Sequence, residues 1–458
     1  KSNDFGEIMI HSLKQAKEAL LKTPEKLEIL RQSHVVDSGA QGFVHFLEGV
    51  LNLIQAGNLR QYLSGDPVQE LQELPAEIIT PEKTDHRYCV EGMITGTKIP
   101  LANIKSFLIS QGDAVIVAGN EARCRFHLHA NHPEAVFMNL RQDGLLVEQK
   151  VDDMVRQQDA LFHRKTSIAL VTDSIADLPD MFMDEHQIYR IPLQVMVEES
   201  PFLDQVTLTT PMLFDLLDKV SEYPTSSQPT SKKVQEMLTF LLQQYDQVLM
   251  LSVSSQNSGT WQVFNQVAKA AHLPGKDIVV IDTKKNSGAE GLLVMRAAEA
   301  IREGKSLEEV AALVDSLIPR TRIFVSVATF EYMVRGGRVS PMKGKLAKWM
   351  NLKPIISLDA DGKGIAFGKA FSQDSNTRKI MEIVQNIHHQ HGVERYCVVH
   401  ADALEKAEQF AVLLESITGK PPAYITEISP IVALNAGRGA VAVALIEAEE
   451  KDGDRLQH

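Results

Sequence analysis

The stretch Gln247-Val-Leu-Met-Leu-Ser-Val-Ser-Ser-Gln-Asn-Ser-Gly-Thr-Trp261 decides the fold of the chain around it. It begins as an apolar run, becomes rich in hydroxyl and amide side chains after Leu251, and continues beyond Trp261 with apolar residues at helical spacing. The apolar run predicts a buried parallel strand, and the later spacing predicts a helix with one apolar face. The polar segment is therefore a strand-to-helix loop, the place where α/β sheets bind ligands.

A second stretch, Tyr223-Pro-Thr-Ser-Ser-Gln-Pro-Thr230, also places hydroxyl residues just before an amphipathic helix. The N-terminus of a helix offers free N–H groups and the positive end of a dipole to an anion. In the first stretch, Ser258-Gly259-Thr260 adds two hydroxyls and a glycine that permits close approach. One interpretation is that both loops hold a single anionic head group. The other is that both are ordinary N-caps, because Ser and Thr are favoured there.

Composition bounds the class of protein. The chain has 458 residues, which predicts two or three domains, and its formal net charge is −12. That charge argues against nucleic acid or an anionic membrane surface as the main partner. The three cysteines, Cys89, Cys124 and Cys397, are typical of a reduced, cytoplasmic protein. The sequence contains no apolar run long enough for a membrane span.

The C-terminal two-thirds has the pattern of an α/β fold. Apolar strands at residues 168–172, 248–253, 278–282 and 323–327 alternate with helical stretches, which predicts a doubly wound parallel sheet. A second unit is expected after Pro341, with strands near 354–358, 396–400 and 440–446 and helices near 374–390 and 403–417. We therefore expect two α/β subdomains, at residues 165–340 and 341–458.

Four motifs in this region together resemble the DegV family of fatty-acid-binding proteins over nearly the whole span 165–450. The resemblance implies an acyl chain in an apolar tunnel between two α/β subdomains, with its carboxylate held by two hydroxyl loops. On this sequence the carboxylate-binding positions fall on Ser226, Ser227 and Ser258, with Gly259 and Thr260 beside them. The motifs are Val171-Thr-Asp-Ser-Ile-Ala-Asp-Leu178, Thr225-Ser-Ser-Gln-Pro-Thr230, Ser254-Ser-Gln-Asn-Ser-Gly-Thr260 and Phe330-Glu-Tyr-Met-Val-Arg-Gly-Gly-Arg-Val339.

Three further residues are candidates for the same site. Arg338 matches a surface loop of the family, where it either steers the head group, docks a kinase domain, or is a solvated arginine in a Gly-Gly turn. Asn435, in Leu434-Asn-Ala-Gly-Arg-Gly439, stands where the family usually has a histidine. This departure puts in doubt that a histidine stands beside the phosphate that a kinase domain would transfer to the ligand. Asp173 either orients the hydroxyl loops or caps the following helix.

Residues 83–162 predict a small α+β domain with strands near 114–118 and 123–129. His127 and His129 are two residues apart, so on a strand they point to the same face. With a cysteine thiolate they make a chemically sensible zinc set whose fourth position is open to water or substrate. Two solvent-facing histidines are the alternative.

The same stretch resembles the middle domain of bacterial fatty-acid kinases, through Tyr88-Cys-Val-Glu91 and the strand that carries the two histidines. The resemblance implies that Cys89, His127 and His129 bind zinc and that Cys124 packs in the core.

Residues 1–62 predict helices, and residues 63–82, with their prolines and mixed charge, predict a linker. The segment His34-Val-Val-Asp-Ser-Gly-Ala-Gln-Gly42 resembles the last part of a DhaL-type kinase domain, found in dihydroxyacetone and fatty-acid kinases. The resemblance implies that Asp37, Ser38 and Gly39 are the remnant of a nucleotide loop; a simple helical hairpin is the alternative. The family's Asp-rich loop for Mg-ATP is absent from this sequence, so we expect Mg-ATP to bind only the complete parent protein.

Three functions follow from these patterns. In the first, the chain binds a long-chain fatty acid and presents its carboxylate to a DhaL-type kinase domain, in cis or in trans, as part of an ATP-dependent kinase. In the second, it is a non-enzymatic lipid carrier whose helical segment only mediates oligomerisation, for example as a homodimer. In the third, it is a dihydroxyacetone (glycerone) kinase acting on a small polar substrate. Against the third, the hydroxyl loops contain no histidine to bind such a substrate covalently.

Overall fold

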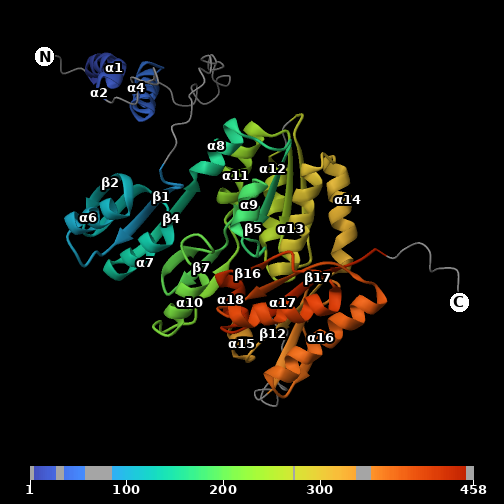
Figure 1. The fold of residues 1–458 in the computed structure, drawn as a ribbon. Coiled ribbons are helices and arrows are strands. Elements are labelled where there is room, and N and C mark those ends of the chain that lie inside the picture. Colours follow the sequence, from blue (N-terminus) through green and yellow to red (C-terminus); the bar gives the residue numbers. More distant parts are fainter. Residues whose placement is uncertain (1–4, 27–35, 57–84, 272–273, 337–351, 450–458) are drawn as a thin grey trace. The chain divides into compact units, whose positions relative to one another are not determined.

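The computed structural model describes residues 5–26, 36–56, 85–271, 274–336 and 352–449 (Figure 1). The predicted linker at residues 63–82 and Arg338 lie outside the described residues. The chain divides into two compact units, Lys1–Lys83 and Thr84–His458. Among the described helices, none is both long and apolar enough to cross a lipid bilayer.

The first unit is helical, as the sequence predicts. It contains α1 (Phe5–Leu21), α2 (Thr23–Lys26) and α4 (Ser38–Ala56). Helices α1 and α4 pack together, and Lys17 forms a 2.6 Å ion pair with Glu48. Asp37 Oδ1 accepts a 2.6 Å hydrogen bond from the N–H of Ala40, and the Asp37 N–H donates to Thr23 Oγ1 at 2.9 Å. Asp37 therefore satisfies an N–H group in the first turn of α4, as an N-cap does.

The second unit begins with a four-stranded antiparallel sheet in the order β2-β3-β1-β4. Its inner face is apolar: Phe126 and Phe137 are buried, and a Cβ on Gly92 would lie 2.4 Å from the Phe126 ring. Cys124 is fully buried on this face, as expected. The elements are β1 (Tyr88–Thr95), α6 (Leu101–Gln111), β2 (Gly112–Asn120), β3 (Arg123–Ala130), α7 (Pro133–Asp143), β4 (Leu145–Asp153) and the connecting helix α8 (Met154–Phe162).

The next sheet is parallel, in the order β11-β10-β5-β6. Alternate residues of its strands face opposite sides. Val171 and Met250 pack with α11 and α12, and Leu170 and Leu249 belong to the core with α13 and α14. The elements are β5 (Ile168–Asp173), α9 (Asp180–Glu185), β6 (Tyr189–Ile191), α11 (Ser231–Gln244), β10 (Gln247–Ser252), α12 (Thr260–Ala270), β11 (Asp277–Asp282), α13 (Ser287–Arg302), α14 (Leu307–Leu317) and the 3-10 turn η1 (Ile318–Arg320).

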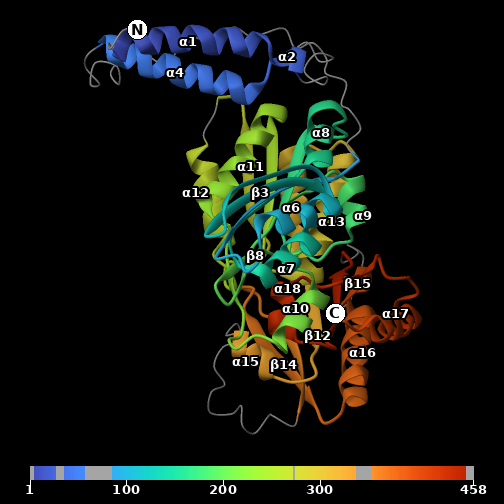
Figure 2. The same cartoon turned by 90° about the vertical axis from the view of Figure 1, so that its left-hand side faces the viewer.

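A six-stranded sheet follows, in the order β14-β13-β12-β17-β15-β16. Helices α16 and α17 pack on one face (Figure 2), whereas α13 contacts strands of this sheet and also β5 of the parallel sheet. The elements are β12 (Thr321–Ser326), α15 (Glu331–Gly336), β13 (Lys353–Leu358), β14 (Gly364–Ala370), α16 (Gln373–Gln390), β15 (Val393–His400), α17 (Leu404–Thr418), β16 (Ile425–Glu427), α18 (Pro430–Ala436) and β17 (Val441–Glu447).

The α/β fold class is confirmed, but one strand lies in the other sheet. The strand expected at residues 323–327 of the first sheet is β12, which pairs antiparallel with β13 and β17. The second sheet is accordingly mostly antiparallel, with β15 and β16 as a parallel pair. An apolar run indicates that a strand is buried, but pairing with a strand far away in the sequence depends on tertiary packing.

A small antiparallel three-stranded sheet has the order β8-β7-β9. It carries Ser226 and Ser227 on its edge strand β9. Its elements are β7 (Gln194–Val197), β8 (Ser200–Leu203), α10 (Thr210–Leu217) and β9 (Thr225–Ser227).

Candidate functional site

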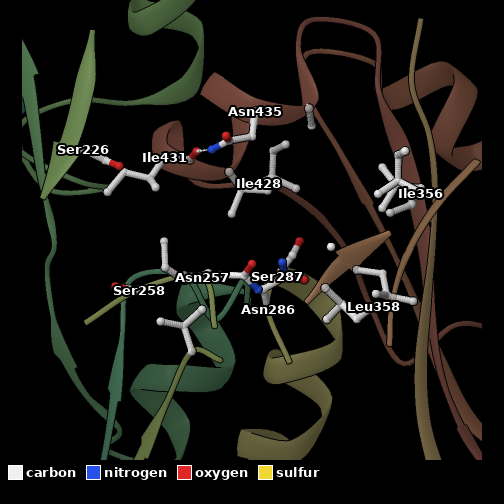
Figure 3. A pocket seen from close by; sticks show the side chains of 18 of the residues that line it. Ser226, Asn257, Ser258, Asn286, Ser287, Ile356, Leu358, Ile428, Ile431 and Asn435 are labelled. Carbon is white, nitrogen blue, oxygen red and sulfur yellow. Dashed lines mark hydrogen bonds between the residues drawn. The ribbon is translucent and has the colours of Figure 1, made fainter. Parts of the chain in front are cut away.

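A cavity of about 550 Å³ lies between the two α/β subdomains. Its volume is in the range usual for small-molecule sites. Figure 3 shows Ser226 and Ser258 on one side of the cavity and Ile356 and Leu358 on the opposite side. The cavity therefore has the predicted serines at one side and the apolar side chains of Ile356 and Leu358 at the other, which suits an amphipathic ligand.

The hydroxyl loops predicted from the sequence meet at this cavity. Ser226, Ser227, Ser258 and Gly259 line it, and so does Asn435. Thr260 is fully buried, with its Oγ1 2.8 Å from Ser258 Oγ, so it positions that serine.

The polar lining residues that were not predicted include Gln228, Asn257, Asn286 and Ser287. The first two belong to the loops already singled out, and their amides were overlooked in favour of the hydroxyls. Asn286 and Ser287 follow β11, at the carboxyl end of a parallel strand. The rule that ligands bind at such strand ends would have found them.

Gly259 allows the two loops to approach each other. A Cβ at this position would lie 1.8 Å from Gln228 Oε1, although the backbone φ of Gly259 is −77° and suits any residue. A glycine therefore suits this position because a side chain would overlap Gln228, and not because of the backbone conformation. Gly259 is also the N-cap of α12, which places the N-terminus of that helix beside Ser258.

Asp173 orients one of these loops. Its Oδ2 accepts a 2.8 Å hydrogen bond from the N–H of Val253, and its Oδ1 accepts one of 2.9 Å from Ile175. The N-cap of the next helix, α9, is Pro179, so Asp173 does not cap that helix. Of the two roles considered from the sequence, the geometry supports the orienting one.

Side chain to backbone hydrogen bonds join the two subdomains around the cavity. Ser254 Oγ and Asn257 Nδ2 donate to the carbonyl of Gly362, at 2.9 and 2.7 Å. Asp177 Oδ1 accepts from Ser429 N at 2.7 Å, and Asp204 Oδ1 accepts from Ile431 N at 3.0 Å. The last two bonds hold the N-terminus of α18, the helix that carries Asn435.

Stability is expected to fall as the pH rises from 5 to 8, because burial raises the pKa of Asp177 to about 8 and that of Asp204 to about 7. Above the ordinary pKa of 3.8, the folded protein then holds more protons than the unfolded chain, which lowers the free energy of unfolding with rising pH. Urea unfolding of wild type and Asp204→Asn measures this. Because the asparagine has no proton to lose, the variant should gain stability relative to wild type as the pH rises; a constant difference contradicts the prediction.

A second cavity, of about 420 Å³, lies between the four-stranded sheet of the middle domain (the middle sheet, β2-β3-β1-β4) and the parallel sheet. Its charged walls are largely paired with one another: Arg87 contacts Asp153 and Asp184 at 2.7 Å, and Arg156 contacts Asp184 at 2.6 Å. These ion pairs join the two domains. The first cavity is therefore the better candidate for a ligand.

The sequence of both subdomains matches one family. The profile of the DegV family, described as uncharacterised proteins, matches residues 167–448. The chain belongs to the DegV family. Residues 85–161 match a second profile, that of the middle domain of proteins similar to a fatty acid kinase component.

Relatives of the DegV region are known in several bacteria. A DegV domain-containing protein of Clostridium acetobutylicum is 27% identical over 282 residues, which cover 61% of this chain and 99% of that protein. Protein DegV of Bacillus subtilis is 27% identical over 281 residues, 60% of this chain and 98% of that protein.

Solved structures share the fold. A fatty acid binding DegV family protein from Streptococcus agalactiae has a TM-score of 0.57 at 26% identity, covering 62% of this chain and 100% of its own. DegV of Bacillus subtilis, described as a fatty acid binding protein, has a TM-score of 0.56 at 25% identity, covering 62% and 99%. A DegV family protein from Thermus thermophilus, described by its fatty acid binding, has a TM-score of 0.55 at 28% identity, covering 61% and 99%.

The middle domain brings together Cys89, His127 and His129, whose ligand atoms all lie within 4.8 Å of one another. Cys89 pairs with His129 across β1 and β3, and Cys89 Sγ is 3.8 Å from His127 Nδ1. Within the described part of the chain, these are the three His, Cys, Asp or Glu side chains whose ligand atoms lie close enough together to share one metal ion. One sulfur and two nitrogen donors on half-buried side chains fit zinc.

Proposed function

We propose that this chain binds a long-chain fatty acid in the cavity between its two α/β subdomains. The carboxylate lies at Ser226, Ser227, Ser258 and Gly259, with Thr260 positioning Ser258. The acyl chain extends toward Ile356 and Leu358. The observation that carries the proposal is the placement of hydroxyl loops and apolar walls at opposite sides of one cavity. The fatty acid binding described for DegV proteins of 25–28% identity supports it.

The energetics of such a ligand suit this division. Each buried methylene contributes about 0.8 kcal/mol, so a long acyl chain gains on the order of 10 kcal/mol before the cost of association, roughly 4–15 kcal/mol. A buried carboxylate costs several kcal/mol unless it is hydrogen-bonded. The tail therefore supplies affinity, and the hydroxyl loops supply orientation.

The same proposal extends to phosphorylation. A DhaL-type kinase domain, in the parent protein or in trans, would transfer the γ-phosphoryl group of Mg-ATP to a carboxylate oxygen, giving an acyl phosphate and ADP. The match of residues 85–161 to a fatty acid kinase domain supports this context. Helix α4 also exposes Phe43 and Phe46, at 57% and 63%, which suits packing against further protein.

Five residues have proposed roles in this step. Asn435 lines the cavity, and its Nδ2 donates to the Ile431 carbonyl at 3.0 Å. Its side-chain amide would contact the head group. Arg338 would dock the kinase domain or steer the head group. Asp37, Ser38 and Gly39 would belong to the edge of the nucleotide site.

We also propose that Cys89, His127 and His129 hold a zinc ion. The ion would link β1 to β3 and stabilise the open face of the middle sheet. Burial raises the pKa of the Cys89 thiol and lowers the pKa of the His127 imidazole. A divalent zinc ion would displace the proton of the Cys89 thiol on binding.

Lipid binding is tested by mass spectrometry of organic extracts of the purified protein. We expect about one long-chain fatty acid per chain, and its loss in the double variant Ser226→Ala/Ser258→Ala, because the carboxylate would lose its hydroxyl partners. The matched control is Ser316→Ala/Ser416→Ala, in which both exposed serines bond only to local helix carbonyls. A wild-type extract without fatty acid, together with no uptake of added fatty acid, refutes the proposal. The alternative of a kinase acting on a small polar substrate would then be favoured. Consumption of ATP and fatty acid by the parent protein separates a kinase from a lipid carrier.

A further inference from the structure

Glu91 lies beside the Cys89, His127 and His129 group. It follows Cys89 by two residues on β1, so both side chains point to the same face of the sheet. Glu91 pairs with His127 across the strands, as Cys89 pairs with His129. The four side chains thus occupy two neighbouring cross-strand pairs on one face, where opposite Cβ atoms are about 5 Å apart.

The Glu91 carboxylate approaches two of the three ligand atoms. Glu91 Oε1 lies 3.9 Å from Cys89 Sγ and 3.9 Å from His127 Nδ1. Zinc bonds of about 2.3 Å to sulfur and about 2.0 Å to nitrogen or oxygen separate the ligand atoms of a tetrahedron by about 3.4 Å. A side-chain rotation would close the difference of about half an ångström to these two atoms. Glu91 lies outside the group whose ligand atoms are all within 4.8 Å of one another, so it must also turn toward His129 to complete the site.

A second carboxylate positions the site from outside. Asp113 Oδ1 lies 3.3 Å from His129 Nδ1, across the pairing of β2 with β3. An outer carboxylate of this kind orients a ligating imidazole through the nitrogen that does not bind the metal. Glu91 and Asp113 therefore have different relations to the group, since Glu91 approaches two of its ligand atoms.

We propose that Glu91 is the fourth protein ligand of the metal held by Cys89, His127 and His129, so that the coordination sphere is closed to water. This inference rests on the proposed metal site. A thiolate and a carboxylate would balance the charge of a divalent ion, and the imidazoles would be neutral. The sequence predicts an open fourth position at this site; four protein ligands make it a structural site instead.

Lys150 is the partner that Glu91 gives up on binding the metal. Lys150 Nζ lies 3.2 Å from Glu91 Oε1 and 2.6 Å from Asp152 Oδ2, so the lysine keeps one carboxylate when Glu91 turns away. Lys150 and Glu91 are both more than two-fifths exposed, and an ion pair of that exposure contributes little. Glu91 therefore loses little when it breaks its ion pair with Lys150 and binds the metal ion instead.

The test uses the full chain, produced in cobalt-supplemented medium so that Co²⁺ reports the geometry of the site. Wild type is expected to show the strong visible absorption of four-coordinate cobalt, with a thiolate charge-transfer band, and no response to azide. Glu91→Gln keeps the size of the side chain but not its charge. Its cobalt spectrum should change on adding azide, because a solvent position has opened. We expect its zinc affinity to fall more than about 100-fold, beyond the loss typical of an outer-shell change.

Two further variants complete the design. Glu148→Gln removes another carboxylate of the same sheet, which pairs with Arg125 at 2.8 Å, and should behave as wild type. Glu91→Asp keeps a carboxylate and should restore part of the affinity. A wild-type site that responds to azide, or a Glu91→Gln variant with the wild-type spectrum and affinity, overturns the role of Glu91. A wild-type protein that takes up neither cobalt nor zinc overturns the metal site itself. Fatty-acid content, measured separately, is untouched by either result.

Discussion

Replacing Gly362 by alanine is expected to lower the free energy of unfolding by about 2–4 kcal/mol and to reduce the fatty acid retained by the protein. Gly362 has a φ of +88°, and its added Cβ would lie 2.7 Å from the Lys284 carbonyl and 2.3 Å from Ser254 Oγ. Its own carbonyl accepts the hydrogen bonds of Ser254 and Asn257. The substitution therefore strains the turn and pushes the β13–β14 hairpin away from the loop that lines the cavity.

Gly304→Ala is the matched control. Gly304 has a nearly identical φ of +84°, but a Cβ there would meet nothing within 4 Å. Gly304→Ala should lower the free energy of unfolding only by the backbone strain, about 1 kcal/mol, and leave the fatty acid in place. Urea unfolding and mass spectrometry of extracts measure both effects. Equal stability losses, with lipid retained in both variants, would show that the hairpin contact does not hold the cavity together.

Affinity is expected to rise steeply with the length of the acyl chain. Each methylene buried against the apolar walls contributes about 0.8 kcal/mol, close to a fourfold change in Kd. From ten to sixteen carbons the gain is about 5 kcal/mol, a factor of about 3000, until the cavity is filled. Competitive displacement of a fluorescent fatty acid, at concentrations below those at which the lipids form micelles, measures the series.

The hydroxyl loops should affect this series differently. Ser226→Ala/Ser258→Ala should weaken the binding of every chain length by a similar factor and leave the slope unchanged, because in the proposed binding mode these residues contact only the head group. Ile356→Asn should reduce the slope, since it places an amide against the tail. A Kd independent of chain length in wild type would place the acyl chain outside the cavity.

The sequence was sufficient for elements whose signal is local. The apolar run before Ser252 became strand β10, and the spacing after Trp261 became α12, because each pattern reports which face of one element is buried. Ser306 and Glu309 form a capping box at the start of α14, and their spacing of three residues is a local signal of the same kind. The two hydroxyl-rich stretches could be paired in advance because each precedes an amphipathic helix, whose N-terminus suits an anion.

Relations between distant segments were beyond the sequence. Its local pattern did not show that β12 pairs with β17, that Asn286 and Ser287 join the cavity, or that the carbonyl of Gly362 receives the side chains of Ser254 and Asn257. Each depends on the packing of two subdomains, and so on contacts between residues far apart in the chain.

The sequence by itself determined the buried strands, the hydroxyl-rich loops and the cysteine and histidines of the middle domain, because residue type and spacing carry that information. Only the tertiary structure decided how they combine. Strand pairing brought Glu91 opposite His127, and the closing of one subdomain on the other gave the hydroxyl loops apolar walls to face. The physical reason is that burial and side-chain direction follow from local periodicity, whereas register and domain packing are set by long-range contacts that many sequences of the same pattern satisfy differently.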